Sequence, residues 1–239
     1  MKRLVLFHGD KGGVGKSYVA HLTTAVLLDV GNPITLIDGD AKNPGLYRSF
    51  NLKPGPVLRI NARKPDGVDA MVEAFLEASG DVLIDLPAGG SDTTAAFVGT
   101  GSAAGTIDIN SLMKEVDGRL TVFFVLDQGR DGLVALIEEL KVLPRDVTDW
   151  IIVRNHRHDE PFDRLTKWLD ENAAQVANAI FVDMPSLDRK VVEALVTAKK
   201  HIGEIESDDD FSMLSKLRAK SALRVWRREL EKAGFVKNA

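Results

Sequence analysis

The chain has 239 residues, of which 44% are hydrophobic and 28% are charged, and its net charge is −4. These values are typical of a globular protein and exclude a disordered or low-complexity chain. Cysteine is absent, which excludes disulfides, thiolate zinc sites, Cys-ligated iron–sulfur clusters and Cys nucleophiles. Every apolar run is shorter than the ~18 residues of a membrane-spanning helix, and the first run is too short for a signal peptide, so we expect a cytoplasmic protein.

Short apolar runs alternate along the chain with segments of helical periodicity. Because most of these runs are continuous, they predict strands that are buried on both faces of a parallel sheet. We therefore expect one domain over residues 1–239 with a doubly wound, mostly parallel α/β fold, whose ligand lies at the carboxyl ends of the strands. The predicted strands are Leu4–His8, Ile34–Ile37, Val82–Leu86, Thr121–Leu126, Trp150–Val153 and Ile180–Asp183. The predicted helices are 16–30, 67–79, 131–143, 162–176, 187–199 and 211–233.

The first predicted strand is followed by a glycine-rich loop, Lys11-Gly12-Gly13-Val14-Gly15-Lys16-Ser17, and then by a helix. Glycines allow the backbone to curl so that several N–H groups converge on an anion, and the start of the helix adds partial positive charge. In such a loop Lys16 can reach the β- and γ-phosphates of a nucleotide, while the Ser17 hydroxyl can ligate Mg²⁺. The segment therefore predicts a phosphate-binding loop, or P-loop.

Carboxylates follow two of the predicted strands. The second strand runs into Asp38-Gly39-Asp40, and a later strand runs into Asp85-Leu86-Pro87-Ala88-Gly89. A single Asp at a strand end is often only a turn or helix cap. Three of them beside a P-loop indicate a magnesium–nucleotide site, because Mg²⁺ prefers oxygen ligands.

These motifs together resemble those of one protein family. Residues 11–17 read K-G-G-x-G-K-S, whereas the usual P-loop would have glycine in place of Asp10. This deviant form resembles the P-loop of the ParA/MinD family of ATPases, and the segments D-x-D at 38–40 and D-x-P-x-G at 85–89 resemble that family's switch regions. The resemblance implies a P-loop NTPase fold, ATP and Mg²⁺ as cofactors, an ATP-dependent homodimer, and slow hydrolysis stimulated by an activating protein partner.

The same resemblance implies roles for individual residues. Lys11 corresponds to the signature lysine, which reaches the nucleotide of the partner subunit. Asp38 and Asp85 would hold Mg²⁺ through water, together with Ser17, and Asp40 would orient or deprotonate the attacking water.

The base side of the site is also implied by the resemblance. Asn155 follows a predicted strand, where a family asparagine bonds the adenine edge, and Met184 and Pro185 resemble the segment that covers the base. The guanine motif N-K-x-D is absent after Asn155, which favours ATP over GTP. The backbone of the loop and the residue after it complete the expected nucleotide contacts: Gly12, Gly13, Val14, Gly15, Lys16, Ser17 and Tyr18.

Two departures from the family narrow the resemblance. Tyr18 stands where many relatives have Thr, which removes one hydroxyl contact to the α-phosphate. Residues 38–43 read D-x-D-x-x-N, without the Gln found in chromosome partition ATPases. Both features are more similar to the plasmid conjugal-transfer and stability branch, the TraL- or StbB-like ATPases.

The C-terminal helix predicts a partner. Residues 211–239 contain eight Lys and Arg against two Glu, a net charge of +6, and an acidic stretch at 204–210 precedes them. A basic end on an acidic body favours a polyanionic partner, and we expect nonspecific DNA in a bacterial nucleoid or plasmid setting. A solvated helix face and a protein partner are the alternatives, and a membrane is disfavoured because 234–239 has only two bulky apolar residues. One helix face is apolar (Ala219, Ala222, Leu223, Trp226, Leu230, Ala233), and the other is cationic (Lys216, Lys220, Arg224, Arg227).

Some features predict no site. Residues 99–105 miss a dinucleotide fingerprint by one residue of spacing and are expected to form a loop, and the segment 88–118 around them has no assignment. A membrane-positioning ATPase and an ATP-dependent small-molecule kinase or amidating synthetase of the same fold remain alternatives to a DNA-associated switch. Four histidines are interpreted as packing or surface residues rather than bases or metal ligands: His8, His21, His156 and His158.

Overall fold

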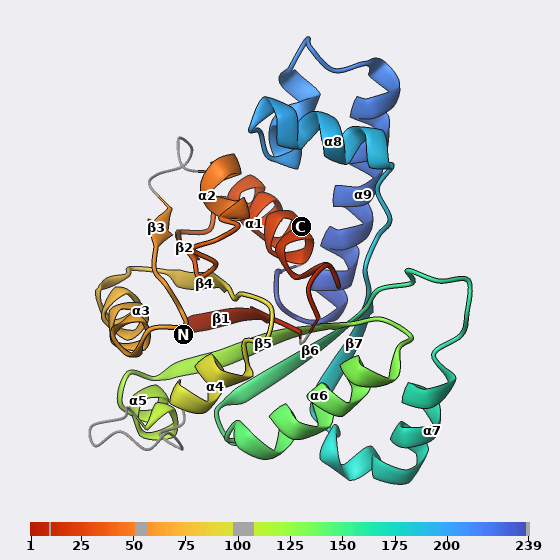
Figure 1. Cartoon of the computed structure of the whole chain (residues 1–239). Helices are drawn as coiled ribbons and strands as arrows, with labels where there is room; N and C mark the ends of the chain where they lie inside the picture. The colour runs from red at the N-terminus through yellow and green to blue at the C-terminus, as the bar shows by residue number, and fades with distance from the viewer. Residues whose placement is uncertain (10, 51–56, 98–107, 238–239) are drawn as a thin grey trace.

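A computed structural model describes residues 1–9, 11–50, 57–97 and 108–237 of the chain. Within these ranges, seven strands form one sheet in the order β3-β2-β4-β1-β5-β6-β7, with helices on both sides (Figure 1). Each adjacent pair of strands is parallel, so the predicted parallel α/β fold is confirmed. The strands are β1 Lys2–His8, β2 Ile34–Asp38, β3 Leu58–Arg59, β4 Asp81–Asp85, β5 Gly118–Leu126, β6 Thr148–Arg154 and β7 Ala179–Asp183.

The helices cover the two faces of the sheet as separate layers. Along β1, Val5 and Phe7 face one apolar cluster, which includes residues of α1, α2, α8 and α9. Leu4 and Leu6 face the other cluster, which includes residues of α3, α5, α6 and α7. The alternation places a core on each face, as the continuous apolar runs predict. The helices are α1 Lys16–Asp29, α2 Gly45–Phe50, α3 Pro65–Glu77, α4 Ser91–Phe97, α5 Ile109–Glu115, α6 Arg130–Val142, α7 Asp163–Asn172, α8 Arg189–Ala198 and α9 Met213–Lys232, with 3-10 turns η1 Ala173–Gln175 and η2 Ile202–Ser207.

The predicted long elements are all present, with ends shifted by a few residues, whereas several short ones escaped prediction. The two-residue strand β3 and the helices α2, α4 and α5 are too short to show a clear period. The helices α4 and α5 fill much of the unassigned segment 88–118. The loop expected at 99–105 lies outside the described residues.

The order of the strands positions the functional site. After β1 the chain crosses to β2 and β3, and β4 then returns to lie between β2 and β1. The loops that follow β1, β2 and β4 therefore leave the sheet side by side at its carboxyl edge. These are the loops that carry the P-loop and the three aspartates.

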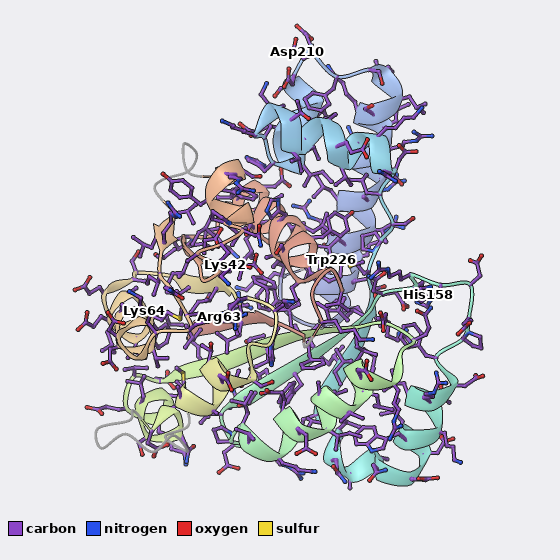
Figure 2. The ribbon with its side chains drawn as sticks, in the orientation of Figure 1. Lys42, Arg63, Lys64, His158, Asp210 and Trp226 are labelled. Atoms are coloured by element: carbon purple, nitrogen blue, oxygen red, sulfur yellow. The ribbon has the colours of Figure 1, made fainter. Side chains whose placement is uncertain are left out.

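The last helix packs along α1 through the face predicted from its sequence (Figure 2). Ala219, Ala222, Trp226 and Leu230 are buried, while Leu223 and Ala233 are partly buried against the same cluster. The Trp226 indole Nε1 donates a hydrogen bond to the Thr23 hydroxyl at 3.0 Å inside the core. The apolar docking face is therefore confirmed.

We expect Trp226→Ala to lower the free energy of unfolding by about 3–5 kcal/mol, because it removes a fully buried aromatic side chain. It also leaves the Thr23 hydroxyl without its indole donor. Val225→Ala is the matched control: it changes the neighbouring exposed residue and should cost no more than about 0.5 kcal/mol. Urea unfolding followed by circular dichroism measures both, and equal losses would contradict the packing role of Trp226.

Candidate nucleotide-binding site

The P-loop has the backbone geometry that its glycines predict. Gly13 and Gly15 have φ angles of 76° and 110°, a region that residues with a side chain rarely adopt. Gly15 caps α1 in a left-handed conformation and, having no side chain, makes no capping hydrogen bond to the free N–H groups of that helix end. A Cβ atom at Gly15 would lie 3.0 Å from the Met184 sulfur. The start of α1 therefore remains open to an anion.

The two lysines of the P-loop differ in their surroundings. Lys16 is buried, and its Nζ donates to the Lys11 carbonyl at 2.9 Å, which holds the loop closed on itself. The Lys11 side chain is 40% exposed and its Nζ lies 3.0 Å from a carboxylate oxygen of Asp131, at the start of α6. In this structure the Lys11 side chain therefore contacts a residue of its own chain, Asp131.

Asp38 and Asp85 are brought together by the sheet. They are directly paired residues at the ends of β2 and β4, and they are 1% and 2% exposed. The Asp38 carboxylate accepts backbone hydrogen bonds from Asp40 at 3.1 Å and Tyr47 at 3.0 Å. The Ser17 hydroxyl lies near the Asp85 carboxylate and lowers its pKa, and Asp85 Oδ1 is buried without a hydrogen-bond partner in the described structure.

The paired carboxylates shift the acid–base behaviour of the site. Burial raises the pKa of Asp85 to about 7, and the nearby negative charge of Asp38 adds to the effect, while Ser17 and Lys16 oppose it. Burial also raises the pKa of Asp38 above its usual value. A divalent cation would relieve this repulsion and would occupy the unpartnered Asp85 oxygen. The donor set of one hydroxyl and two carboxylates fits Mg²⁺.

Asp40 lies at the same edge but is more open to solvent. Its Oδ1 accepts hydrogen bonds from the backbone N–H groups of Lys42 at 3.0 Å and Asn43 at 3.1 Å. This turn fixes the carboxylate next to the buried pair, where its charge contributes to the raised pKa of both Asp38 and Asp85.

The residues predicted to contact the base meet on the other side of the P-loop. The Asn155 side-chain amide donates to the Val14 carbonyl at 2.8 Å, and both Asn155 and Met184 approach Gly15. Pro185 is buried beside Met184. Tyr18 points elsewhere, into a mainly apolar cavity of about 240 Å³ between α1, α2 and α8, where burial raises the pKa of its phenol.

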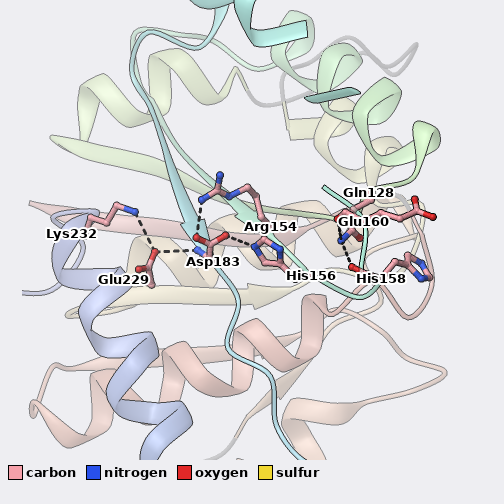
Figure 3. Close-up of polar contacts among 8 residues, drawn as sticks. All are labelled: Gln128, Arg154, His156, His158, Glu160, Asp183, Glu229 and Lys232. Atoms are coloured by element: carbon pink, nitrogen blue, oxygen red, sulfur yellow. Dashed lines mark hydrogen bonds and ion pairs between the residues drawn. The ribbon is translucent and has the colours of Figure 1, made fainter. Parts of the chain in front are cut away.

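A network of polar contacts holds the loop that carries Asn155 (Figure 3). The Asp183 carboxylate contacts His156 Nε2 at 2.6 Å and accepts a hydrogen bond from Arg154 at 2.8 Å. The Gln128 side chain donates to the carbonyls of His158 at 2.8 Å and Glu160 at 3.0 Å. His156 therefore stabilises the loop through its side chain and His158 through its backbone carbonyl. In the described ranges, no group of three or more His, Asp or Glu could hold a metal ion.

The other two histidines are packed inside the protein. His8 is fully buried at the end of β1, with its Nε2 3.1 Å from a Glu139 oxygen. His21 stands edge-on to Phe50 with ring centroids 5.3 Å apart. Burial, helped by the charge of His201, lowers the pKa of His21 to about 4, so its ring is neutral near pH 7. The expected packing roles are confirmed.

One segment of the site escaped sequence analysis. The chain after β3 runs between the two acidic loops: Ile60 N–H donates to the Asp38 carbonyl at 3.1 Å, and Ala62 N–H donates to the Gly39 carbonyl at 3.3 Å. Arg63 then donates to the Ala88 carbonyl at 2.5 Å. The segment was missed because β3 has only two residues, although its basic residues were visible in the sequence.

Comparison with known proteins agrees with the fold described above. No family model matches the chain. It is 30% identical over 159 residues to Protein MobD from Acidithiobacillus ferrooxidans, an alignment that covers 66% of each chain and so just under two thirds of that relative. Among solved structures, it is similar to the septum site-determining protein MinD of Pyrococcus horikoshii complexed with Mg-ADP, with a TM-score of 0.53, 13% identity and complete coverage of both chains. It is also similar to a Cyanothece McdA–ATP complex, with a TM-score of 0.51, 12% identity and coverage of 100% and 98%.

The fold and the motif point to the same class of protein. The chain has the fold of the ParA/MinD-type P-loop ATPases, and its P-loop has the deviant sequence that carries the resemblance to that family. The narrower resemblance to the plasmid conjugal-transfer and stability branch depends only on Tyr18 and residues 38–43.

We expect Asp85 to contribute a loss of stability in the ligand-free protein as pH rises from 5 to 8, while His21, whose folded pKa is lowered to about 4, contributes in the opposite direction. In this range the unfolded Asp85 is ionised, while the folded carboxyl, with a pKa of about 7, still holds its proton at the lower end. At this carboxyl the folded state therefore binds more protons, and raising the pH lowers its contribution to the free energy of unfolding.

Urea unfolding in EDTA at each pH measures this dependence. Asp85→Asn should remove the falling contribution, so that its stability changes more positively with pH than that of the wild type, whereas Asp131→Asn, which changes an exposed carboxylate near the same site, should keep the wild-type dependence. The same pH slope in the wild type and in Asp85→Asn would contradict the raised pKa.

Proposed function

We propose that this protein is a Mg²⁺-dependent ATPase that acts as a switch, with two copies joined when ATP is bound and separated after hydrolysis. The observation that supports it best is the pair of buried carboxylates, Asp38 and Asp85, which meet beside the P-loop without enough neutralising charge of their own. The divalent metal ion that accompanies a nucleotide would supply the missing positive charge.

In this proposal the P-loop binds the phosphates. The backbone N–H groups of residues 12–17 surround them, and Lys16 exchanges its bond to the Lys11 carbonyl for the β- and γ-phosphates. Ser17, Asp38 and Asp85 would hold Mg²⁺, which neutralises phosphate charge when bound. Asp40 orients or deprotonates the attacking water.

The base lies on the opposite side of the P-loop, against Asn155, Met184 and Pro185. The proximity of Asn155 and Met184 to Gly15 supports this placement, and the Asn155 amide bonded to Val14 links base recognition to the P-loop backbone. Tyr18 follows the loop, but its side chain lines a separate cavity. In this proposal it fixes the position of the first turn of α1 and supplies no hydroxyl contact to the nucleotide.

Lys11 contributes to the site of the second copy. To do so it must leave Asp131, and because both side chains are largely exposed, such a pair is worth only about 0–1 kcal/mol. A cation placed on the γ-phosphate stabilises the charge that develops during transfer. Without an identified arginine finger, we expect slow turnover that an activating protein partner stimulates.

The switch would control association with DNA or with a DNA-bound partner, in plasmid partition, stability or conjugal transfer. This setting is supported by the narrower resemblance of Tyr18 and residues 38–43 and by the basic regions of the surface. No helix in the described ranges is long and apolar enough to cross a bilayer. Phe235 and Val236 are only 6% and 7% exposed, which disfavours the alternative of attachment to a membrane through these residues.

We expect Lys16→Ala to weaken binding of a fluorescent ATP analogue by about tenfold or more, because it removes a charge-assisted hydrogen bond to the phosphates. Lys167→Ala, on the exposed surface of α7, is the matched control and should bind as the wild type does. Equilibrium fluorescence titration measures both. Unchanged affinity in Lys16→Ala would defeat the assignment of the site.

Asp40→Ala should retain ATP binding but slow hydrolysis by about 10²–10⁴-fold, the usual contribution of a general base. The ATP-bound dimer should then persist. Phosphate release measures turnover, and light scattering after gel filtration with ATP measures the dimer. Hydrolysis at the wild-type rate would remove Asp40 from the mechanism.

A further inference from the structure

A second basic region lies far from the C-terminal helix in the sequence. Residues 41–65 contain six Lys and Arg and no Asp or Glu. Five of these cations are described, and all five are exposed. We name them the β3-edge surface: Lys42, Arg48, Arg59, Arg63 and Lys64.

The fold gathers these cations along one edge of the sheet. β3 is the edge strand, and its Arg59 guanidinium lies 5.0 Å from the centre of the Tyr47 ring on α2. The chain before Arg63 is bonded to the loop before Lys42, through Ala62 N–H and the Gly39 carbonyl. Lys42, Arg63 and Lys64 all lie on the half of the molecule that carries β3 (Figure 2).

The two basic regions differ in how their charges are balanced. In the described structure, none of the five cations of the β3-edge surface has an ion-pair partner within 4.0 Å. On α9, by contrast, most cations face acidic residues, and the preceding acidic stretch supplies two of these partners. The pairs are Lys216–Asp209, Arg218–Asp188, Lys220–Glu206, Arg227–Asp29 and Lys232–Glu229.

We propose that the β3-edge surface, rather than α9, binds the phosphate backbone of duplex nucleic acid. Cations without counter-charges release the most condensed ions when they meet phosphates, and such contacts need no base recognition. A protein partner would instead require apolar or aromatic anchors. The large apolar side chain exposed at this edge is Leu58, at 38%, so the chemistry of the surface favours phosphates.

The position of the surface connects it to the nucleotide. The main chain of residues 60–62 is bonded to the Asp38 and Gly39 carbonyls, and Arg63 is bonded to the Ala88 carbonyl of the second acidic loop. A change in these loops on nucleotide binding therefore moves part of the surface. This regulation depends on the proposed ATPase function, whereas the binding of phosphates by the surface does not.

The test compares two double variants of the full chain. Arg48→Ala/Arg59→Ala removes two cations of the β3-edge surface. Arg224→Ala/Arg228→Ala is the matched control on α9, where both residues are exposed. Anisotropy of a labelled random-sequence DNA duplex of about 30 base pairs is measured with ATP-Mg²⁺, ADP-Mg²⁺ and no nucleotide, over a series of salt concentrations. Each binding reaction is accompanied by a thermal melt, and by a titration with a fluorescent ATP analogue, to confirm folding and nucleotide binding.

We expect the β3-edge variant to lose about tenfold or more in DNA affinity, with the slope of log affinity against log salt reduced by about 2, because two phosphate contacts are lost. The α9 variant should bind as the wild type does. Arg48→Lys/Arg59→Lys should retain binding, since phosphate contacts of this kind require charge rather than a guanidinium.

Three results would overturn the proposal. The α9 variant could lose DNA affinity while the β3-edge variant keeps it. The wild type could bind ATP but no DNA in any nucleotide state. Polyglutamate could displace the duplex at equal charge concentration, which would indicate an acidic protein as the partner. A different result would separate the two proposals. If the wild type binds DNA but not ATP, and Arg48→Ala/Arg59→Ala loses the DNA binding, the proposed ATPase is wrong and the surface assignment stands.

Discussion

Two carboxylates buried side by side at the edge of a parallel sheet determine how the rest of this site is arranged. Asp38 and Asp85 are paired in register; burial raises the pKa of both, the charge of Asp40 adds to each, and the charge of Asp38 adds to that of Asp85. Such a pair is unfavourable unless positive charge is nearby. Lys16 and the Ser17 hydroxyl from the P-loop supply part of what is needed, and the remaining negative charge is of the kind that a divalent cation would balance.

The same edge of the sheet connects the site with two separate parts of the surface. On one side, residues 60–63 bond both acidic loops and continue into exposed cations. On the other side, Asp183 holds the loop after Asn155 through Arg154 and His156, and its own N–H donates to Glu229 on α9 at 3.1 Å. A nucleotide between these loops would therefore act on the β3 edge and on the C-terminal helix at once.

The number of cations in a segment does not decide which surface carries unbalanced positive charge, because ion pairs formed on folding neutralise some of them. The C-terminal segment and residues 41–65 each contain many cations, but among the residues that the structure describes only those of the first have ion-pair partners. Arg227 and Asp29 form one such contact although they are 198 residues apart. Because a surface ion pair lowers the field that a distant polyanion experiences, the segment with fewer partners is the better candidate for binding phosphates.

Sequence alone determined the class of fold, the P-loop, the three aspartates and the docking face of α9. Each of these depends on residue types at short spacing or on the period of a long element, such as the glycines before Lys16 or the apolar positions around Trp226. Tertiary structure alone decided that Asp38 pairs with Asp85, that Lys11 lies against Asp131, and that most of the α9 cations are balanced while the described ones beside β3 are not. These contacts join residues far apart in the chain, and a two-residue strand has no period from which to predict it.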